Sequence, residues 1–536
     1  MRFRLFAIAL AVLWLHSPAW AKDVYDMGKV QVTGKDAQSE NSSPDSNEIS
    51  LEMGEKSNPM PEIMPDPILP EKKPLDEKEF DVHPKIIRRD EVYGGYGRGS
   101  RNSSEAYFGG KGTYNGYVGQ IHLSREARDG YKSYVNDLKT QADAELTSIG
   151  EGSYELTVSG KLGSDNFAQR GTRDIPTPDA GIEDTYRSLA AKGHSTLADG
   201  AFFSAYGKLD TISRNIANTA VSFIEDSSGF SGKFGGEYKK KIKPQFDGKA
   251  AIDIKRDTYS LTDGPDQELT KRRLTLSGEY DFKGRSFLEF GFRDLTLMER
   301  SRTAPFINFD YRWAKPWQLY LSYDEDLGND DIQTIYMPHR YVGFSSLKAS
   351  HIKRTAGKIN YHNAEGDTFG IELFSERETG AMEYFDNYDP GKAMLVSQFR
   401  FIPKVKRTGT RIHGGVKLEE HFTLRASTTF QDPREEDSNR RLSYEPKRTL
   451  DISLDYRGGP IDLGFSRKAL FDRTAYVPKA VDAEDYSRSD LTVKYSINKN
   501  FKAYLKIKDL YDEAKKLRYN VQEEGRISLA GVEADY

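Results

Sequence analysis

Apolar and polar residues alternate along most of the chain. In "SFLEFGFRD", residues 286–294, the apolar residues Leu288, Phe290 and Phe292 are separated by charged residues and a glycine. "FKAYLKIKD", residues 501–509, repeats the pattern with lysines on its polar face. Because successive side chains of a strand point to opposite faces, each such segment is predicted to be a β-strand with one apolar face. We count about 22 of them, with an uncertainty of several, and find no convincing amphipathic helix among them.

The connections between these segments differ in length in the last third of the chain. "RGG" at residues 457–459 and "NKN" at residues 498–500 are tight turns, whereas residues 430–447 and 511–525 are long and charged. Short turns at one end and long loops at the other are typical of transmembrane β-barrels, which must be closed because no open sheet edge is tolerated in lipid. The prediction is an all-β transmembrane antiparallel barrel over residues 87–536, with about 22 strands and a range of 16–24.

A barrel of this kind faces lipid with its apolar side and encloses a lumen with its polar side. The residues predicted to line the lumen are Lys502, Lys506, Asp451 and Asp455. The alternative, a secreted β-sandwich or β-solenoid, would have to bury the apolar faces against each other. The sequence offers no direct sign of that second layer, so the barrel is preferred.

The last strand carries its own signal. Val532, Ala534 and Tyr536 lie on one face of "GRISLAGVEADY", and acidic residues lie between them. A terminal aromatic residue on an amphipathic last strand resembles the signal that the outer-membrane assembly machinery reads in barrel proteins. These three residues are therefore the expected barrel-assembly signal, with the lipid bilayer and that machinery as partners.

Residues 1–21 have the features of a signal peptide. Arg2 and Arg4 precede an apolar run from Leu5 to Leu15, and residues 19–21 form an A-x-A cleavage site. The alternative, an uncleaved membrane anchor, is less favoured because the run is too short to span a bilayer comfortably. No later segment approaches eighteen consecutive apolar residues, so no other transmembrane helix is expected.

Two further segments precede the barrel. Residues 22–35 contain "MGKVQVTG", in which Val30 and Val32 alternate with polar residues, as in a short strand that needs a partner sheet. Residues 36–86 are acidic and contain seven prolines between Pro59 and Pro84. This composition predicts a disordered linker that favours polyproline II, and about fifty residues could reach roughly 150 Å when extended.

The composition excludes several classes of function. The chain has 536 residues, no cysteine and a net charge of −4, so there is no disulfide framework and no general attraction to nucleic acid. Its nine histidines are scattered without a metal-binding or catalytic spacing, and no cofactor is expected. An enzymatic barrel, such as a lipase or protease, is disfavoured because no nucleophile and base are paired.

Two short stretches could suggest other chemistry. "GGYGRGS", residues 94–100, is rich in glycine but does not lie between a strand and a helix, so packed barrel strands explain it better than nucleotide binding. "YDEDLGNDD", residues 323–331, offers oxygen ligands for Ca²⁺, although a solvated loop at the barrel rim is the preferred interpretation.

A strand-like peptide just after a signal peptide, followed by a large C-terminal barrel, resembles the TonB-dependent outer-membrane receptors. In that family the peptide is the TonB box, which the periplasmic protein TonB captures by strand addition. The resemblance assigns this role to Met27, Gly28, Lys29, Val30, Gln31, Val32, Thr33 and Gly34. "DGY" at residues 129–131, after the first glycine-rich strands, is also similar to that family.

The chain departs from the family in one respect. Family members carry a globular plug between the box and the barrel, and here that interval is the proline-rich linker. The resemblance therefore implies a plug-less transporter or channel in the outer membrane of a Gram-negative bacterium, with its N-terminal arm in the periplasm. A separate protein or inward-folded loops could fill the lumen, or fewer strands could make a porin. The alternative is a scaffolding barrel whose arm binds another periplasmic partner.

Overall fold

A computed structural model gives the structure of the protein. It describes residues 24–25 and 91–535, except for 115, 130–135, 149–153, 169–179, 198, 219–220, 262–263, 283–285, 298–299, 315, 329–349, 364–365, 390–393, 419–420, 478, 484, 512–515, 519–520 and 523–524. The described residues contain no helix that is long and apolar enough to cross a membrane. Nearly all of them belong to strands.

The strands follow the predicted period-two segments. The first half of the barrel consists of β2 (Glu91–Gly99), β3 (Ser104–Tyr114), β4 (Tyr117–Asp129), β5 (Asn136–Ser148), β6 (Tyr154–Ala168), β7 (Ala180–Thr196), β8 (Phe202–Asn218), β9 (Phe223–Lys243), β10 (Phe246–Leu261), β11 (Gly264–Asp281) and β12 (Phe287–Leu297). The second half consists of β13 (Arg300–Ala314), β14 (Trp317–Gly328), β15 (Ser350–His362), β16 (Thr368–Asp389), β17 (Met394–Leu418), β18 (Phe422–Glu435), β19 (Arg448–Gly458), β20 (Ile461–Phe471), β23 (Asp485–Ser496), β24 (Phe501–Lys508) and β27 (Ile527–Asp535).

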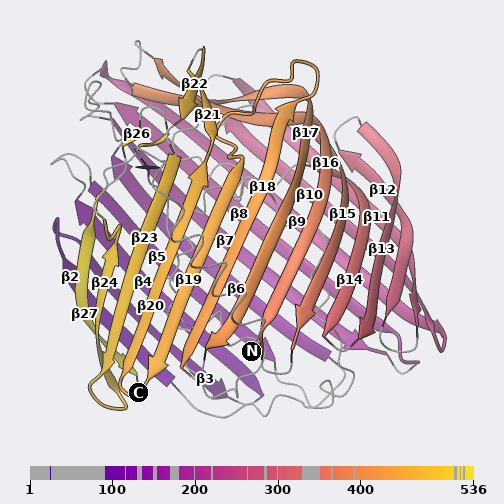
Figure 1. Ribbon diagram of the computed structural model, residues 1–536, viewed down its shortest axis with the longest axis horizontal. Helices are drawn as coiled ribbons and strands as arrows, with labels where there is room; N and C mark the ends of the chain where they lie inside the picture. Colours follow the sequence, from indigo (N-terminus) through magenta and orange to yellow (C-terminus); the bar gives the residue numbers. More distant parts are fainter. Residues whose placement is uncertain are drawn as a thin grey trace.

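These 22 strands form a closed antiparallel barrel, which confirms the predicted fold class and strand number. Each strand pairs with the next one along the barrel, and the last strand, β27, pairs with the first, β2, from Tyr93↔Asp535 to Gly99↔Leu529. Figure 1 shows the tilted strands running around the barrel. Closure leaves no continuous free edge along the wall.

Among the described residues, five short strands lie outside the barrel wall. Two of them, β21 (Arg473–Val477) and β22 (Lys479–Ala483), form a hairpin between β20 and β23, and β25 (Lys516–Arg518) pairs with β26 (Val521–Gln522). The strand β1 (Val24–Tyr25) pairs in parallel with the first two residues of β23. We call this end of the barrel, which carries the long connections, the loop end, and the opposite end the turn end.

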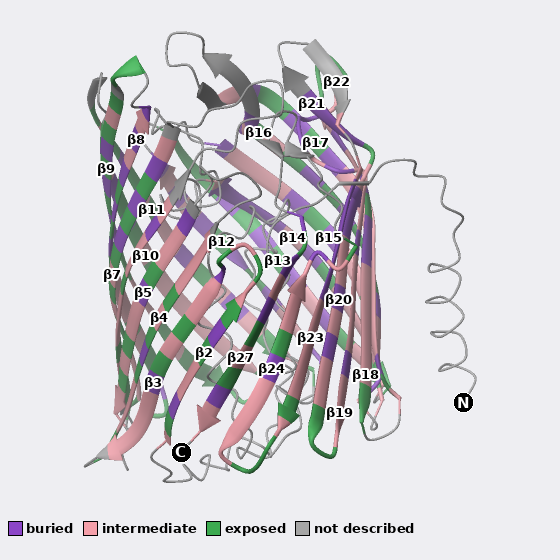
Figure 2. Cartoon of the chain, turned by 90° about the vertical axis from the view of Figure 1, so that its left-hand side faces the viewer, coloured by how far each residue is buried: buried purple, intermediate pink, exposed green. Residues whose placement is uncertain are grey.

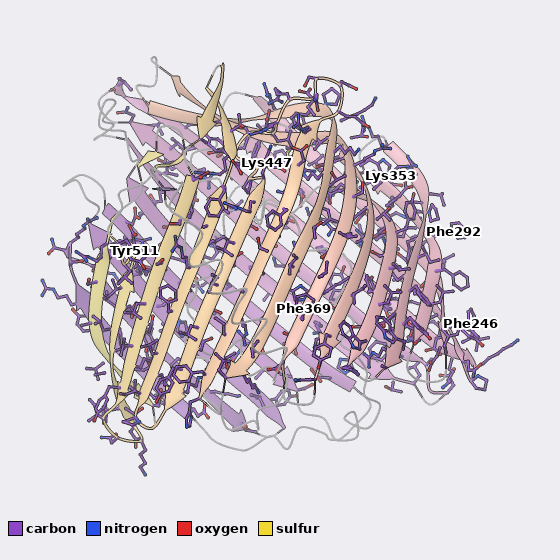
Figure 3. The ribbon with its side chains drawn as sticks, viewed as in Figure 1. Phe246, Phe292, Lys353, Phe369, Lys447 and Tyr511 are labelled. Atoms are coloured by element: carbon purple, nitrogen blue, oxygen red, sulfur yellow. The ribbon has the colours of Figure 1, made fainter. Side chains whose placement is uncertain are left out.

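The two faces of the wall differ as the sequence predicts. Phe292 on β12 is 61% exposed and projects from the outside of the barrel (Figure 3), whereas its neighbour Arg293 is buried. Along the strands, exposed and buried residues alternate (Figure 2). Exposed apolar residues in a barrel that closes on itself form the belt that contacts lipid.

Aromatic side chains form a continuous row on the outside at the turn end. The contacts run along the ends of β11 and β13 and between neighbouring strands, with ring centroids 4.9–6.5 Å apart. The members are Tyr280, Phe282, Phe309, Tyr311, Trp313, Trp317 and Tyr361. Such girdles mark the level of the lipid head groups, so this row places one membrane surface near the turns.

The longest hairpin, β16–β17, bends over the loop end. Gly380 has a φ of 75°, and the pairing passes from Thr379↔Lys404 to Ala381↔Ile402 at this point. Only glycine adopts such a φ at low cost, so Gly380 permits the bend. Beyond it, Ala381 and Ile402 form an apolar cluster with Val405 and Leu442. Figure 1 shows these strands turning across the top of the barrel.

Candidate functional site

The inner wall of the barrel carries most of the chemistry. The four residues predicted to line the lumen all lie on the polar face of their strands. Lys502 forms an ion pair with Asp535 at 3.0 Å, and Asp451 lies opposite Lys468 in the register. Asp455 is buried next to Gly464 of the neighbouring strand. Their part in transport stays a prediction.

The fourth of these residues, Lys506, bridges the closure of the barrel. Its Nζ atom on β24 lies 2.8 Å from Glu105 on β3, so the ion pair crosses both β27 and β2. Lys508 makes a similar bridge to Glu126 on β4 at 3.2 Å. Two ion pairs therefore join the two ends of the barrel sequence from inside the lumen.

Tyrosines lie flat against the inner wall where glycines face them. A Cβ atom added at Gly109 would lie 2.3 Å from the ring of Tyr93, and one added at Gly163 would lie 2.1 Å from the ring of Tyr186. Tyr186 also donates a hydrogen bond to Gln141 at 3.1 Å. The sequence indicated packed glycines in the early strands but gave no sign of their aromatic partners, which lie directly opposite them on the neighbouring strand.

Many charges on the inner wall are paired with each other. Arg214 on β8 donates two hydrogen bonds of 2.7 Å to the two carboxylate oxygens of Asp184 on β7, and both side chains are almost fully buried. Lys494 pairs with Glu533 at 2.8 Å. Buried charges persist in proteins when they are paired in this way. The wall is thus polar and suited to a wet lumen.

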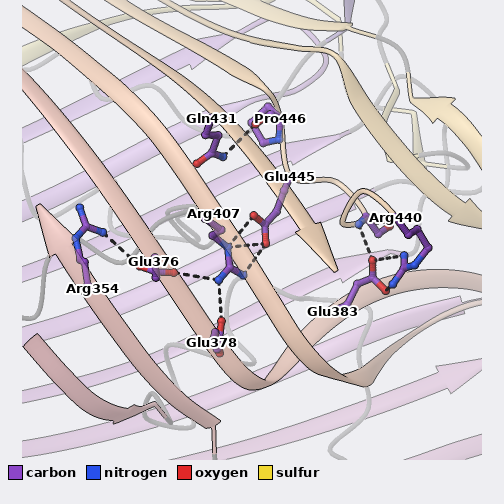
Figure 4. A network of polar contacts seen from close by, with 10 residues as sticks. Arg354, Glu376, Glu378, Glu383, Arg407, Gln431, Arg440, Glu445 and Pro446 are labelled. Atoms are coloured by element: carbon purple, nitrogen blue, oxygen red, sulfur yellow. Dashed lines mark hydrogen bonds and ion pairs between the residues drawn. The ribbon is translucent and has the colours of Figure 1, made fainter. Parts of the chain in front are cut away.

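Toward the loop end, Arg407 on β17 is the centre of a larger network (Figure 4). Its Nη1 atom donates to Glu376 at 3.0 Å and to Glu378 at 2.8 Å, both on β16. Its other nitrogens bind Glu445, which belongs to the connection between β18 and β19. One guanidinium group therefore holds three carboxylates and attaches this connection to the inner wall.

A second network holds the bent hairpin to the same connection. Arg440 donates to both carboxylate oxygens of Glu383, at 2.8 and 3.0 Å, and the backbone N–H of Ser443 donates to Glu383 at 2.7 Å. The ring of Tyr384 lies 6.0 Å from that of Tyr444. The hairpin and the connection form one unit over the loop ends of β18 and β19, which we call the cap (residues 381–389, 394–405 and 436–447).

The interpretation of the acidic stretch as a solvated loop is wrong for residues 323–328, and residues 329–331 lie outside the described residues. Residues 323–328 are part of β14, and Asp324 and Asp326 are buried. Asp324 is paired with Arg293, and Asp326 with Arg273. The period-two signal was hidden because acidic residues occupy both faces of this strand end. No group of three or more His, Asp or Glu in the described part of the chain is arranged to hold a metal ion.

Other predicted site residues can be placed only in part. Val532 is 49% exposed on the outer face of β27, and Ala534 lies on the same face. Tyr536 and the box-like peptide Met27–Gly34 lie outside the described residues. The assembly signal and the TonB contact therefore stay predictions.

No protein-family model matches the chain, and no curated protein matches its sequence. Its structure resembles the FrpB iron transporter from Neisseria meningitidis, with a TM-score of 0.67 and 12% identity over 84% of this chain and 82% of that one. The ferripyoverdine receptor of the outer membrane of Pseudomonas aeruginosa gives 0.66 and 12%, over 84% and 72%. The siderophore receptor PirA from Acinetobacter baumannii gives 0.65 and 10%, over 83% and 80%. At these identities the likeness establishes the barrel fold.

Proposed function

We propose that the protein is an outer-membrane transporter that moves a solute through its lumen and is coupled to TonB by its N-terminal peptide. The observation that carries the proposal is the wall itself, which combines an apolar outer belt and aromatic girdle with a charged lumen face. A closed wall of this kind suits a passage for polar solutes through a membrane. The named neighbours, an iron transporter and siderophore receptors, support transport as the activity.

In this proposal the turn end faces the periplasm and the loop end faces the outside, as in other outer-membrane barrels. Val30, Val32 and Thr33 would add as a strand to TonB, and the linker of residues 36–86 would carry them to it. In the structure Val24–Tyr25 pair with β23 at the loop end. The proposal therefore requires this segment to leave that pairing before TonB binds.

The absence of a plug between residues 36 and 86 is also part of the proposal. A barrel of about 22 strands has a lumen that other proteins fill with a plug. Here either a separate protein or the N-terminal segment would close it. Ferric siderophores are the first solutes to test, because the structural neighbours are named for them.

Single-channel conductance in a planar bilayer tests the pathway. The full chain and a variant without residues 22–86 are each refolded and inserted. Conductance in the truncated form only would support an N-terminal segment that closes the lumen, and steady conductance in both would support an open pore that needs a partner. No conductance in either form, with the barrels shown to be inserted, would contradict transport through the lumen.

A further inference from the structure

The wall of the barrel is split between β13 and β14 near the loop end. The ladder between β12 and β13 continues to Leu297↔Arg300, and that between β14 and β15 continues to Gly328↔Ser350. The ladder between β13 and β14 stops earlier, at Ile307↔Tyr323. Within the described residues, the segment 300–306 of β13 thus has no strand on its β14 side.

Pro305 explains where the ladder stops. Continuing the register beyond Ile307↔Tyr323 would place Pro305 opposite Glu325. Proline has no N–H group and is tolerated in a sheet where its nitrogen faces away from a ladder partner. Pro305 keeps its pairing with Phe292 on β12, so the missing donor falls on the β14 side. Pro305 in β13 therefore determines where the split begins.

Side chains close the split instead of backbone hydrogen bonds. Arg302 on β13 lies 2.9 Å from the carboxylate of Glu325 on β14. Glu325 is only 3% exposed, because Lys353 at 3.2 Å, His351 at 3.1 Å and the hydroxyl of Tyr323 also contact it. These contacts form a lock across the split.

A second set of contacts holds the end of β14 against the β12–β13 hairpin. Leu327 of β14 forms an apolar cluster with Leu295, Leu297 and Ala304 of the β12–β13 hairpin. The ion pairs of Asp324 with Arg293 and of Asp326 with Arg273 fix the end of β14 to β12 and β11. The end of β14 therefore lies across the inner face of the hairpin rather than beside β13.

The split begins level with the last apolar residues of the outer belt and continues beyond them toward the loop end. On the outer face of β12, the apolar Phe290 and Phe292 are followed by Asp294. On β13, Ile307 is followed toward the loop end by Pro305 and Thr303. The opening would thus join the lumen to the aqueous side of the membrane rather than to the acyl chains.

We propose that the loop-side end of the β12–β13 hairpin (residues 293–297 and 300–306) is a flap that opens a side entrance to the lumen. Its β14 side is held by side-chain contacts alone, which can break without unpairing the barrel. The cap lies over β18 and β19, away from this opening. The flap rests on the proposed function, since an entrance has a use only if solutes pass through the lumen.

Cysteine labelling tests the flap, because the chain has no cysteine of its own. Leu295, which is 0% exposed on the inner face of the flap, is replaced by Cys, and its reaction with a membrane-impermeant maleimide is followed on intact cells. Adding Glu325→Gln weakens the lock and is expected to speed labelling by about tenfold. The control is Glu268→Gln, which weakens an exposed ion pair with Arg256 at 2.9 Å where β10 and β11 stay paired, at Thr258↔Glu268.

A second variant acts in the opposite direction. Pro305→Val restores the missing donor, so the ladder can extend and labelling of Leu295→Cys should slow severalfold. Equal labelling rates in the Glu325→Gln and Glu268→Gln backgrounds, or no slowing by Pro305→Val, would overturn the flap. Heat-modifiable migration in gels confirms that each variant is assembled. Labelling reports opening whether or not solutes pass, so a failed conductance test and a failed flap are distinguishable.

Discussion

Arg407 and Glu445 form a bidentate ion pair. The Nη2 atom of Arg407 lies 2.9 Å from one carboxylate oxygen of Glu445, and its Nε atom lies 3.0 Å from the other. Arg407 belongs to the barrel wall and Glu445 to the cap. The fork geometry of arginine fits a carboxylate in a way that lysine cannot, so this pair fixes the position of the cap as well as its charge.

Replacing Arg407 by Ala should release the cap. Three carboxylates would lose their shared cation, and breaking a buried ion pair from one side costs about 3 kcal/mol or more. We expect faster proteolysis of residues 436–447 on intact cells, with the barrel still assembled. Arg407→Lys should give an intermediate rate. Equal proteolysis of Arg407→Ala and the native chain would show that the network does not hold the cap.

The contact between Tyr186 and Gly163 predicts that substitutions at the two positions have coupled effects on the free energy of unfolding. Gly163→Ala would push its Cβ atom into the ring of Tyr186, and overpacking of this kind costs about 1–3 kcal/mol of unfolding free energy. The cost should fall in a Tyr186→Ala background, where the ring is absent. Gly160→Ala, on the outer face of the same strand with only one atom within 4 Å, should be nearly neutral. Denaturant unfolding in lipid vesicles measures all four variants, and equal costs in the two backgrounds would contradict the contact.

Because the two faces of the wall differ, substitution by arginine should affect the stability of the barrel differently at two neighbouring residues. Ile252 is exposed on the outer face of β10, so Ile252→Arg should destabilise the inserted barrel by about 2–4 kcal/mol. Ala251 faces the lumen opposite Glu237, so Ala251→Arg gains a partner and should be tolerated. Unfolding in lipid vesicles separates them. A similar cost for both substitutions would show that the faces are wrongly assigned.

The cap should loosen in acid. Glu435 lies beyond the apolar belt, and the hydroxyl of Ser438 and the guanidinium of Arg440 donate to it and hold its pKa below the ordinary value of 4.5. A lowered pKa adds stability above 4.5 that is lost as the pH falls through the lowered value. Pepsin cleavage of residues 436–447 should therefore rise below that pH. Glu435→Gln should remove this part of the pH dependence, and an unchanged profile would argue against it.

The sequence predicted the barrel well because a strand in this wall has one lipid face and one wet face. Leu288, Phe290 and Phe292 show the rule clearly. It failed at the end of β14, where Asp324 and Asp326 on one face and Glu325 on the other pair with arginines from other strands. The network around Arg407 also could not be predicted, because its glutamates come from two separate elements, β16 and the connection between β18 and β19.

The central claim, that TonB energises this barrel, is tested most directly by site-specific photo-crosslinking in living cells. A photoreactive amino acid is placed at Val32, in the proposed box. The control position is Asp199, in the turn between β7 and β8 at the turn end. The account predicts an adduct that contains TonB from Val32 and none from Asp199. No TonB adduct from Val32 in cells that carry the assembled barrel would contradict it.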